Sequence, residues 1–529
     1  MEPHERAASM SRDEIAALLV AHESVTRTNR TLTEANRALV AELAEVKRQV
    51  AWFQRQLFGQ KSERRVLDPA GRQLLLGEQP EEIVPAATET VASYQRRQAR
   101  PAAEDDTEAL RFDPSVPVEE ILIPAPGGVS PATHERVSTK TTERLAQRPA
   151  SYVVLRYVRE VWKERTSGVM VSAPAPRSVL EKSVADVSVL AGLLIDKFAY
   201  HLPLYRQHQR MAAAGVHLSR PTLTNWTHRT AEILVPIYEA QLASILTSAV
   251  LAMDETPIRA GRGKPGKMGR GYFWPIYGDG DEVAFPFATT RSKRFVVETL
   301  KSFGGVLLTD GYEVYTRYAA ATNKIVHARC WSHTRRKFEE ALASGPELCG
   351  EALERIGRLY EFEAELKGKD PPPEKRLQHR AEHLRPEVDA FFTWLRATVE
   401  EQVLLPTHPF LKAAHYALEA EAGLRVFLQY PDVPIDTNHL EREIRPIALG
   451  RKNWLFCSTE IGAYFVGVVQ SLLATCRLHG IPPYTYLVDV LQRVDTHPQS
   501  LVHQLTPRVW KEHFADNPLT SDLARPRSP

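Results

Sequence analysis

The stretches Ala249-Val-Leu-Ala-Met-Asp-Glu-Thr256 and Gly305-Val-Leu-Leu-Thr-Asp-Gly311 each carry a short apolar run that ends in an aspartate. An apolar run of this length, bounded by turn-forming residues, is typical of a buried strand. We therefore expect Asp254 and Asp310 each to lie at the end of a strand. Taken singly, either aspartate is also explained as a helix or turn cap, because aspartate is common at such positions.

The segments between the two runs give an element order. Tyr272–Tyr277 and Val283–Ala288 flank a glycine-containing turn and predict a hairpin. Ser292–Phe303 has the apolar spacing of a helix. Strand, hairpin, helix and strand follow one another in this order in an α/β ribonuclease-H-like fold, where the first and fourth strands lie side by side. This fold would bring Asp254 and Asp310 together at one edge of the sheet.

A third acid, Glu441, lies in a basic segment predicted to form a helix from about Asn438. The spacing Asn438-x-x-Glu441 also fits a variant of the capping box, in which the glutamate would bond the helix backbone. Two other glutamates compete for any role as a ligand. Glu443 is on the same helix but on a different side, and Glu255 follows the first aspartate directly.

Three neighbouring carboxylates have a chemical use. Like charges a few ångströms apart raise one another's pKa unless a cation lies between them. Magnesium prefers hard oxygen ligands, so Asp254, Asp310 and Glu441 suit it as both catalytic and metal-binding residues. Two such ions about 3.5–4 Å apart would serve phosphoryl transfer. We therefore expect two Mg²⁺ ions, for which Mn²⁺ can substitute.

Basic residues accompany the acids. Arg259–Arg270 is a glycine-rich loop with five cations and no acid, which would attract a DNA backbone, or else form a solvated hairpin loop. Cys330-x-x-His333 supplies only two metal ligands, which do not close a zinc site, so a packing and support role is preferred. The DNA-binding candidates are Arg259, Arg262, Lys264, Lys267, Arg270, Arg335, Arg336, Lys337, Arg442, Arg445, Arg451 and Lys452.

The composition of the 529 residues is that of a soluble globular protein, with 43% hydrophobic and 25% charged residues and a net charge of +2. No signal peptide is evident at the start. The apolar stretch Phe465–Cys476 is short and interrupted by polar residues, so no membrane span is expected. Four cysteines without paired spacing favour a reduced, cytoplasmic protein. The length predicts about three or four domains.

The pattern along the chain predicts these domains. An apolar heptad with asparagines at its seam predicts a dimerising coiled coil, although a helix packed on its own domain has the same periodicity. A helix, a glycine-containing turn and a helix starting near Pro221 suggest a helix-turn-helix. The expected boundaries are 12–60 coiled coil, 66–108 flexible linker, 109–178 small β-rich module, 180–247 helix-turn-helix-like DNA-binding region, 248–340 first part of the ribonuclease-H-like core, 341–433 helical insertion, and 434–515 second part of the core with C-terminal helices.

The longer motifs resemble a known family. Asp254-Glu-Thr-Pro, Thr309-Asp-Gly-Tyr312, Cys330–Phe338 and above all Asn438–Phe456 are similar to the large transposase of the bacterial insertion sequence 66 family. The similarity extends over nearly the whole chain. It implies a DDE-type DNA transposase in which Asp254, Asp310 and Glu441 hold two magnesium ions. Such an enzyme cuts DNA at the ends of a transposable element and joins the freed 3′-hydroxyl to target DNA.

The resemblance also implies partners and one difference. DNA is the expected partner, with a homo-oligomer formed through the coiled coil, two small accessory proteins as further candidates, no membrane, and a cytoplasmic location at the bacterial nucleoid. Relatives carry a cysteine zinc motif between linker and helix-turn-helix, and cysteine is absent from 109–178. We therefore expect no zinc there. The competing hypotheses are a dimeric DNA-binding regulator with an inactive transposase-like domain, and a nuclease that cuts without joining.

Overall fold

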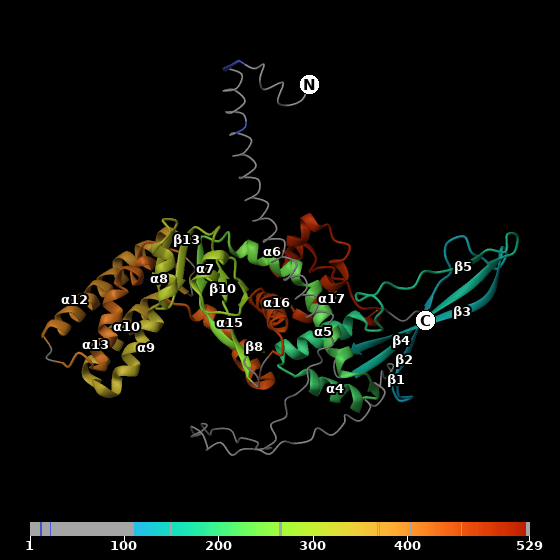
Figure 1. The fold of residues 1–529 in the computed structure, drawn as a ribbon, viewed down its shortest axis with the longest axis horizontal. Helices are drawn as coiled ribbons and strands as arrows, with labels where there is room; N and C mark the ends of the chain where they lie inside the picture. The colour runs from blue at the N-terminus through green and yellow to red at the C-terminus, as the bar shows by residue number, and fades with distance from the viewer. Residues whose placement is uncertain are drawn as a thin grey trace. The chain divides into compact units, whose positions relative to one another are not determined.

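The computed structural model describes residues 111–148, 151–263, 267–367, 369, 371–401, 404–455 and 457–524, together with 11, 12 and 22. The elements below belong to one unit of the chain, residues 84–529 (Figure 1). The predicted linker 66–108 lies outside the described residues. The predicted coiled coil 12–60 also lies outside them, apart from Arg12 and His22. Both remain predictions.

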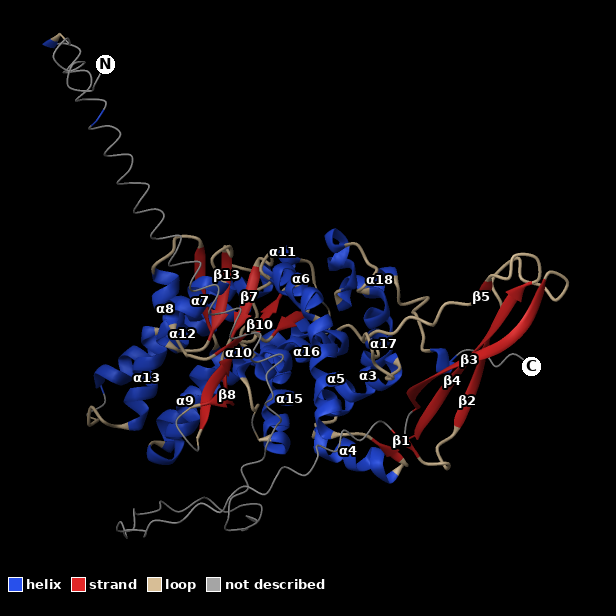
Figure 2. Ribbon diagram, turned by 45° about the vertical axis from the view of Figure 1, so that its right-hand side comes forward, coloured by secondary structure: helices blue, strands red, loops and turns tan. Residues whose placement is uncertain are grey.

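A five-stranded sheet forms the centre of the acid-bearing region (Figure 2). Its strands run in the order β11 (Glu282–Ala284), β10 (Ile276–Gly278), β7 (Val250–Met253), β13 (Gly305–Thr309) and β14 (Ile325–Arg329). β7, β13 and β14 are parallel. β10 runs antiparallel to β7 and to β11, so β10 is the one reversed strand of this sheet. The prediction that the strands leading to Asp254 and Asp310 lie side by side is therefore confirmed.

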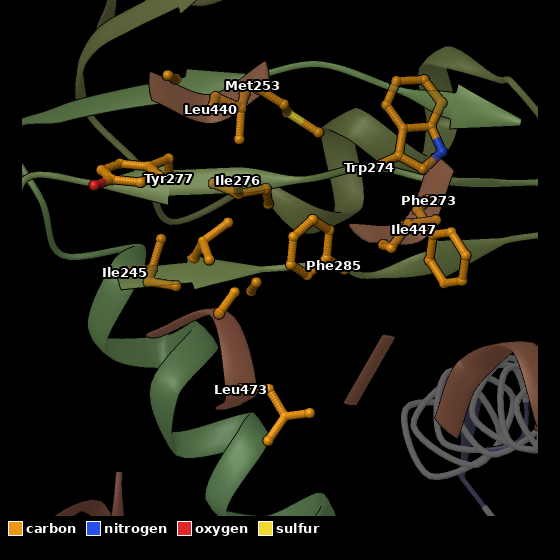
Figure 3. Close-up of a cluster of buried hydrophobic side chains, with 14 of the residues drawn as sticks. Ile245, Met253, Phe273, Trp274, Ile276, Tyr277, Phe285, Leu440, Ile447 and Leu473 are labelled. Atoms are coloured by element: carbon orange, nitrogen blue, oxygen red, sulfur yellow. The ribbon is translucent and has the colours of Figure 1, made fainter. Parts of the chain in front are cut away.

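The apolar runs explain why these strands are central. Every residue of β7 is buried, as expected for a strand covered on both faces. Figure 3 shows Ile245 from helix α6 (Val235–Ile245) and Leu473 from helix α16 (Glu460–Leu478) beside side chains of the sheet. Leu440 and Ile447, both fully buried, come from helix α15 (Asn438–Trp454). Most of the sheet's stability therefore comes from apolar burial.

Helix α16 is the one helix of the described residues that is long and apolar enough to cross a membrane. However, 78% of its apolar window is buried inside the protein. Ser471 and Thr475 on this helix bond the backbone of β11 and Phe285. These contacts identify α16 as a core helix that packs against the sheet.

The predicted hairpin is only partly right. β10 and β11 pair around the expected turn, but Tyr272 and Phe273 belong to a second sheet. That sheet consists of β8 (Thr256–Arg262), β9 (Met268–Phe273) and β12 (Phe287–Ala288). The chain passes between the sheets at Pro275 and Pro286, which have no N–H to donate to a ladder. These two prolines therefore split each predicted strand in two.

The segment between β14 and α15 is largely helical, and the predicted insertion 341–433 lies within it. Where α9 meets the helices of the insertion, Phe391 packs edge to face against Trp331 and Phe338, and Phe338 also contacts the tilted ring of Phe410. Helix α7 (Lys293–Thr299) precedes β13, and α8 (Glu313–Ala320) lies between β13 and β14. The helices after β14 are α9 (Trp331–Ala341), α10 (Pro346–Lys367), α11 (Pro373–His379), α12 (Arg385–Glu401), α13 (Pro409–Glu419) and α14 (Glu421–Leu424).

The residues before the core form strands and then helices. β2 (Val118–Ile123) and β4 (Ser151–Glu164) coincide with the alternating runs Glu119–Pro124 and Tyr152–Trp162, which predict strands, whereas β3 (His134–Arg148) has no such pattern and was not predicted. The helices α3 (Val187–Leu194), α4 (Leu204–Ala213) and α5 (Arg220–Ile233) follow, and Ser219 caps α5 by accepting from the Thr222 N–H. The predicted turn before Pro221 spans Val216–Ser219, but Val216–His217 forms the strand β6, paired with β1 (Arg111–Phe112). β5 (Met170–Ser172) pairs with β4.

The C-terminal helices α17 (Pro483–Arg493) and α18 (Pro507–His513) are joined by one buried acid. The fully buried Asp489 carboxylate accepts hydrogen bonds from Arg493 Nε at 2.6 Å, Trp510 Nε1 at 2.8 Å and the Leu519 N–H at 2.6 Å. A buried charge that is satisfied three times fixes the relative position of these segments.

We expect Asp489→Ala to destabilise the protein by about 3 kcal/mol or more, since it leaves three donors without their acceptor. Calorimetric melting of the variant and the parent protein measures the loss. The matched control is Glu298→Ala, which breaks the exposed pair Arg294–Glu298 and should leave the melting temperature unchanged. Equal melting of Asp489→Ala and the parent would contradict this role.

His327 on β14 gives the fold a dependence on acid. Burial, with a smaller effect of Arg329, lowers the pKa of His327 from 6.5 to about 4, and Thr309 Oγ1 lies 2.9 Å from its Nε2. The unfolded chain takes up this proton below about pH 6.5, while the folded chain does so only near pH 4. The free energy of unfolding should therefore fall as the pH decreases from about 6.5 to about 4. His327→Gln should reduce this slope, measured from urea midpoints at about pH 7.5 and about pH 5.

Candidate functional site

Asp254 and Asp310 follow directly after two neighbouring parallel strands. Leu308 of β13 pairs with Ala252 of β7, so continuing the register by two residues sets Asp310 opposite Asp254. Parallel neighbours lie about 4.8 Å apart in a sheet. The two aspartates therefore share the carboxyl end of the sheet, as predicted from their apolar runs.

Each aspartate is held by a backbone amide. The Glu255 N–H donates to Asp254 Oδ1 at 2.7 Å, and the Tyr312 N–H donates to Asp310 Oδ1 at 2.8 Å. Burial raises the pKa of Asp254 to about 7, with further increases from the charges of Asp310 and Glu255, partly offset by the Glu255 amide and His333. The nearby negative charges raise the pKa of Asp254, which is the effect expected where carboxylates share a cation site and no cation separates them.

Glu441 occupies the first turn of α15. Its Oε1 lies 3.8 Å from His333 Nε2, and its Oε2 lies 3.6 Å from a terminal nitrogen of Arg336. Among the described residues, the buried Oε1 has no hydrogen-bond partner. An acceptor of this kind is unusual inside a protein and is available to a ligand.

The capping-box alternative for Glu441 is wrong. Thr437 precedes the helix and makes no side-chain cap hydrogen bond. The N–H of Asn438 instead donates to Asp436 Oδ1 at 3.0 Å. Asp436 therefore supplies the local hydrogen bonds, and the Glu441 carboxylate does not bond the helix end.

The two rival glutamates have other partners. Glu255 forms an ion pair with Arg291 and accepts from the Tyr315 hydroxyl at 2.9 Å. Glu443 lies 3.4 Å from Arg477. Of these three glutamates, Glu441 has the longest contacts with basic groups, and it alone has a buried oxygen without a hydrogen-bond partner among the described residues.

The donor set suits a hard divalent cation, but it is not closed as the side chains stand. No group of three His, Cys, Asp or Glu in the described ranges is arranged tightly enough to hold a metal ion. Three like charges repel, and here each carboxylate is held by a separate partner: an amide for each aspartate, and His333 with Arg336 for Glu441. The chemistry of the oxygens and the bare Oε1 fit magnesium.

The Cys330–His333 pair lies between the aspartates and Glu441. Burial alone would lower the pKa of His333, but the adjacent Cys330 sulfur and the charges of Asp310 and Glu441 raise it above its ordinary value. His333 was expected only to support the site. Its spacing from Cys330 in the sequence was the signal that could have identified it as a neighbour of the acids.

The basic candidates of the predicted loop are on a hairpin. Arg259 on β8 lies directly opposite Arg270 on β9, and both side chains are exposed, as are Arg262 and Lys267. The prediction of a loop over Arg259–Arg270 is therefore wrong, because most of it pairs as two strands. Lys264 lies outside the described residues. Like charges set opposite each other repel, which favours a polyanion across the ribbon.

The candidates on α9 and α15 divide into paired and exposed residues. Arg335 pairs with Glu339, and Lys337 lies 3.3 Å from Glu340. Arg442, Arg445 and Lys452 are exposed on α15. Arg451 instead donates to the carbonyl oxygen of Pro257 at 2.6 Å and to Thr256 Oγ1 at 3.3 Å. Arg451 thus anchors the end of α15 to β8, close to Asp254.

The helix-turn-helix candidate has a partly buried second helix. Trp226 and Thr227 of α5 are buried and cannot contact a partner, whereas Arg220 and Asn225 are exposed. Arg220 stacks on the ring of Tyr205 from α4, 4.6 Å from its centroid. The DNA-reading role of this region remains a prediction.

Comparison with known protein families identifies the family of this chain. The family model described as "Transposase IS66 family" matches residues 182–464, more than half of the chain. The chain belongs to the IS66 transposase family. The model "IS66 C-terminal element" matches residues 471–508, and "Transposase C of IS166 homeodomain" matches residues 45–121. The chain is thus a member of a transposase family, which implies DNA as its partner.

The chain is also similar to three proteins of Sinorhizobium fredii (strain NBRC 101917 / NGR234). The uncharacterized protein y4hP is 30% identical over 88% of this chain and 88% of its own length. The uncharacterized protein y4jD is 31% identical over 88% of this chain and 94% of its own. The uncharacterized protein y4qI is 29% identical over 74% of this chain and 76% of its own length.

Arg451 and Arg270 should behave oppositely when removed. Arg451→Ala loses charge-assisted hydrogen bonds within the fold and should cost about 1–3 kcal/mol of stability, with little change in the salt dependence of DNA binding. Arg270→Ala should leave melting unchanged and reduce the slope of log affinity against log salt by about one. Thermal melting and fluorescence anisotropy at several salt concentrations measure both. A slope reduced by Arg451→Ala rather than by Arg270→Ala would reverse the assignment.

Proposed function

We propose that this member of the IS66 transposase family is a DDE-type DNA transposase. In this function it cleaves DNA at the ends of a bacterial insertion sequence and joins the freed 3′-hydroxyl to target DNA. The observation that carries the proposal is the register of β7 and β13, which ends two parallel neighbours in Asp254 and Asp310 with the unsatisfied Glu441 nearby.

The strand order supports a ribonuclease-H-like core. In chain order the strands of the central sheet are β7, β10, β11, β13 and β14. Across the sheet their order is β11, β10, β7, β13 and β14, so the first strand lies in the middle, next to the second on one side and the fourth on the other. The second strand alone is antiparallel to the first, whereas the fourth and fifth are parallel to it. This strand order and these strand directions are those expected of a ribonuclease-H-like fold from the element order strand, hairpin, helix and strand.

The acids are proposed to bind two divalent ions. Asp254, Asp310 and Glu441 would hold two Mg²⁺, and Mn²⁺ can substitute because it accepts the same oxygen ligands. When bound, such ions activate the attacking oxygen and stabilise the leaving one. The amides of Glu255 and Tyr312 keep one oxygen of each aspartate fixed, so the other oxygen is oriented in advance.

Basic groups of the chain would bind the DNA backbone. The exposed Arg259, Arg262, Lys267 and Arg270 form one surface on the β8–β9 hairpin, and Arg442, Arg445 and Lys452 form another on α15. Arg336, close to Glu441, would orient a phosphate against the acids. A nucleoid location, a homo-oligomer formed through residues 12–60 and small accessory proteins belong to the same proposal.

Asparagine or glutamine substitutions test the acids. Asp254→Asn, Asp310→Asn and Glu441→Gln should each lower cleavage and strand transfer by about a thousandfold or more, because each removes a charge needed in the transition state. The measurement uses full-length protein, Mg²⁺ or Mn²⁺, and DNA carrying the inverted repeats that flank the gene. Precut ends in a second reaction separate joining from cutting.

Glu443→Gln and Glu255→Gln are the matched controls, and anisotropy measures DNA binding. Glu443→Gln should retain activity, since the Glu443 carboxylate already lies 3.4 Å from Arg477. All acid variants should bind DNA as the parent does. DNA binding by the parent protein without cleavage under either metal would favour the regulator, and cutting without joining would favour the nuclease.

A further inference from the structure

Cys330 lies at the junction between the strand β14 and the helix α9 and is only 2% exposed. Its N–H donates to the carbonyl oxygen of Thr309 at 3.1 Å. Thr309 is the last residue of β13 and directly precedes Asp310. The backbone of Cys330 is therefore fixed to the strand that presents the second aspartate.

The side chain of Cys330 is bonded to a different element. Its Sγ accepts hydrogen bonds from the Thr437 N–H at 3.3 Å and from Thr437 Oγ1 at 3.2 Å. Thr437 immediately precedes α15, and its carbonyl oxygen accepts from the Glu441 N–H at 3.0 Å. A continuous path of hydrogen bonds thus runs from the residue before Asp310, through the thiol, to the backbone of Glu441.

We propose that Cys330 is a positioning residue that sets the spacing between Glu441 and the two aspartates. This inference rests on the proposed function of those acids. The need for such a residue follows from the chain itself, since the whole helical insertion α10–α14 separates β14 from α15. Small errors in the packing of so many helices would otherwise move Glu441 relative to the sheet.

Two neighbouring contacts also hold the start of α9 against the residues at the start of α15. The Trp331 N–H donates to the carbonyl oxygen of Ile435 at 3.1 Å, two residues before Thr437. His333, in the first turn of α9, has its Nε2 3.8 Å from Glu441 Oε1. The start of α9 therefore contacts the start of α15 at three successive places, and the thiol is the only one of them that accepts two hydrogen bonds.

A zinc site is the alternative use of a Cys-x-x-His spacing. Zinc requires a set of about three or four protein ligands. Over the ranges that the structure describes, no third ligand joins Cys330 and His333. The Cys330 sulfur lies 3.1 Å from the Ser332 hydroxyl oxygen and also accepts from Thr437, which is 1% exposed and offers two donors.

Substitution of the thiol tests the proposal in full-length protein. Cys330→Ala removes the acceptor, whereas Cys330→Ser retains an acceptor oxygen at nearly the same place. Outer-shell partners of metal ligands typically contribute about 10–100-fold to metal affinity or activity. We expect Cys330→Ala to weaken Mn²⁺ binding, measured by electron paramagnetic resonance, by about 10-fold or more and strand transfer to a similar extent. Cys330→Ser should recover most of both, and Thr437→Val should give a smaller loss because the Thr437 N–H remains.

Cys349→Ala is the matched control, because Cys349 is also fully buried but lies on α10 in the insertion. It should lower the melting temperature about as much as Cys330→Ala, while Mn²⁺ affinity stays at the parent value. DNA affinity should be unchanged in every variant. These readouts separate positioning of Glu441 from the general loss of a buried sulfur atom.

Three results would overturn the inference. They are Mn²⁺ binding by Cys330→Ala equal to that of the parent, equal losses in Cys330→Ala and Cys349→Ala, and a loss in Cys330→Ser as large as in Cys330→Ala. Asp254→Asn and Glu441→Gln are measured in the same assay. If Asp254→Asn and Glu441→Gln leave Mn²⁺ binding unchanged, the proposed function itself fails. If these two variants lose Mn²⁺ binding but Cys330→Ala does not, only the role of Cys330 is rejected.

Discussion

The parallel pairing of β7 with β13 is the interaction on which the acid-bearing region depends. Burial of both strands requires that every backbone group be bonded within the sheet, which fixes the register. The same register sets two aspartates beside each other, a costly arrangement for like charges. The Glu255 and Tyr312 amides offset part of that cost by donating to one oxygen of each aspartate. Apolar packing of the two strands thus determines that two negatively charged aspartates lie beside each other at this edge of the sheet.

The second constraint is the return of the chain after the insertion. Trp331 packs against Phe391 and Phe392 and donates its ring N–H to the carbonyl oxygen of Leu424, so α9 belongs both to the sheet and to the insertion. Beyond Leu424 the chain reaches Thr437 and α15. At the far end of α15, Arg451 bonds β8. The glutamate helix is therefore tied near its start to the strand of Asp310 and near its end to the strand that follows Asp254.

The sequence predicted the parts of this fold that apolar patterns specify. The strands before Asp254 and Asp310, the start of α15 near Asn438 and the helical insertion could be predicted because buried runs and caps are local signals. The division of Tyr272–Tyr277 between two sheets could not be predicted. A proline indicates that strand pairing ends, but it does not indicate which sheet the following residues join. β3 was missed because its polar and charged residues conceal the alternation of a strand, and the internal bonds of Arg451 depend on contacts far apart in the chain.

The choice among the acids shows what folding adds to a motif. Glu255, Glu441 and Glu443 are the same residue type, each within two positions of a predicted catalytic acid or one itself, and no spacing rule separates them fully. Folding gives Glu255 an arginine and a tyrosine hydroxyl, and gives Glu443 an arginine. Glu441 receives only two longer contacts and keeps one buried oxygen bare. Since a buried acceptor without a partner is unfavourable, that position persists at the cost of stability, as expected where a ligand completes the site.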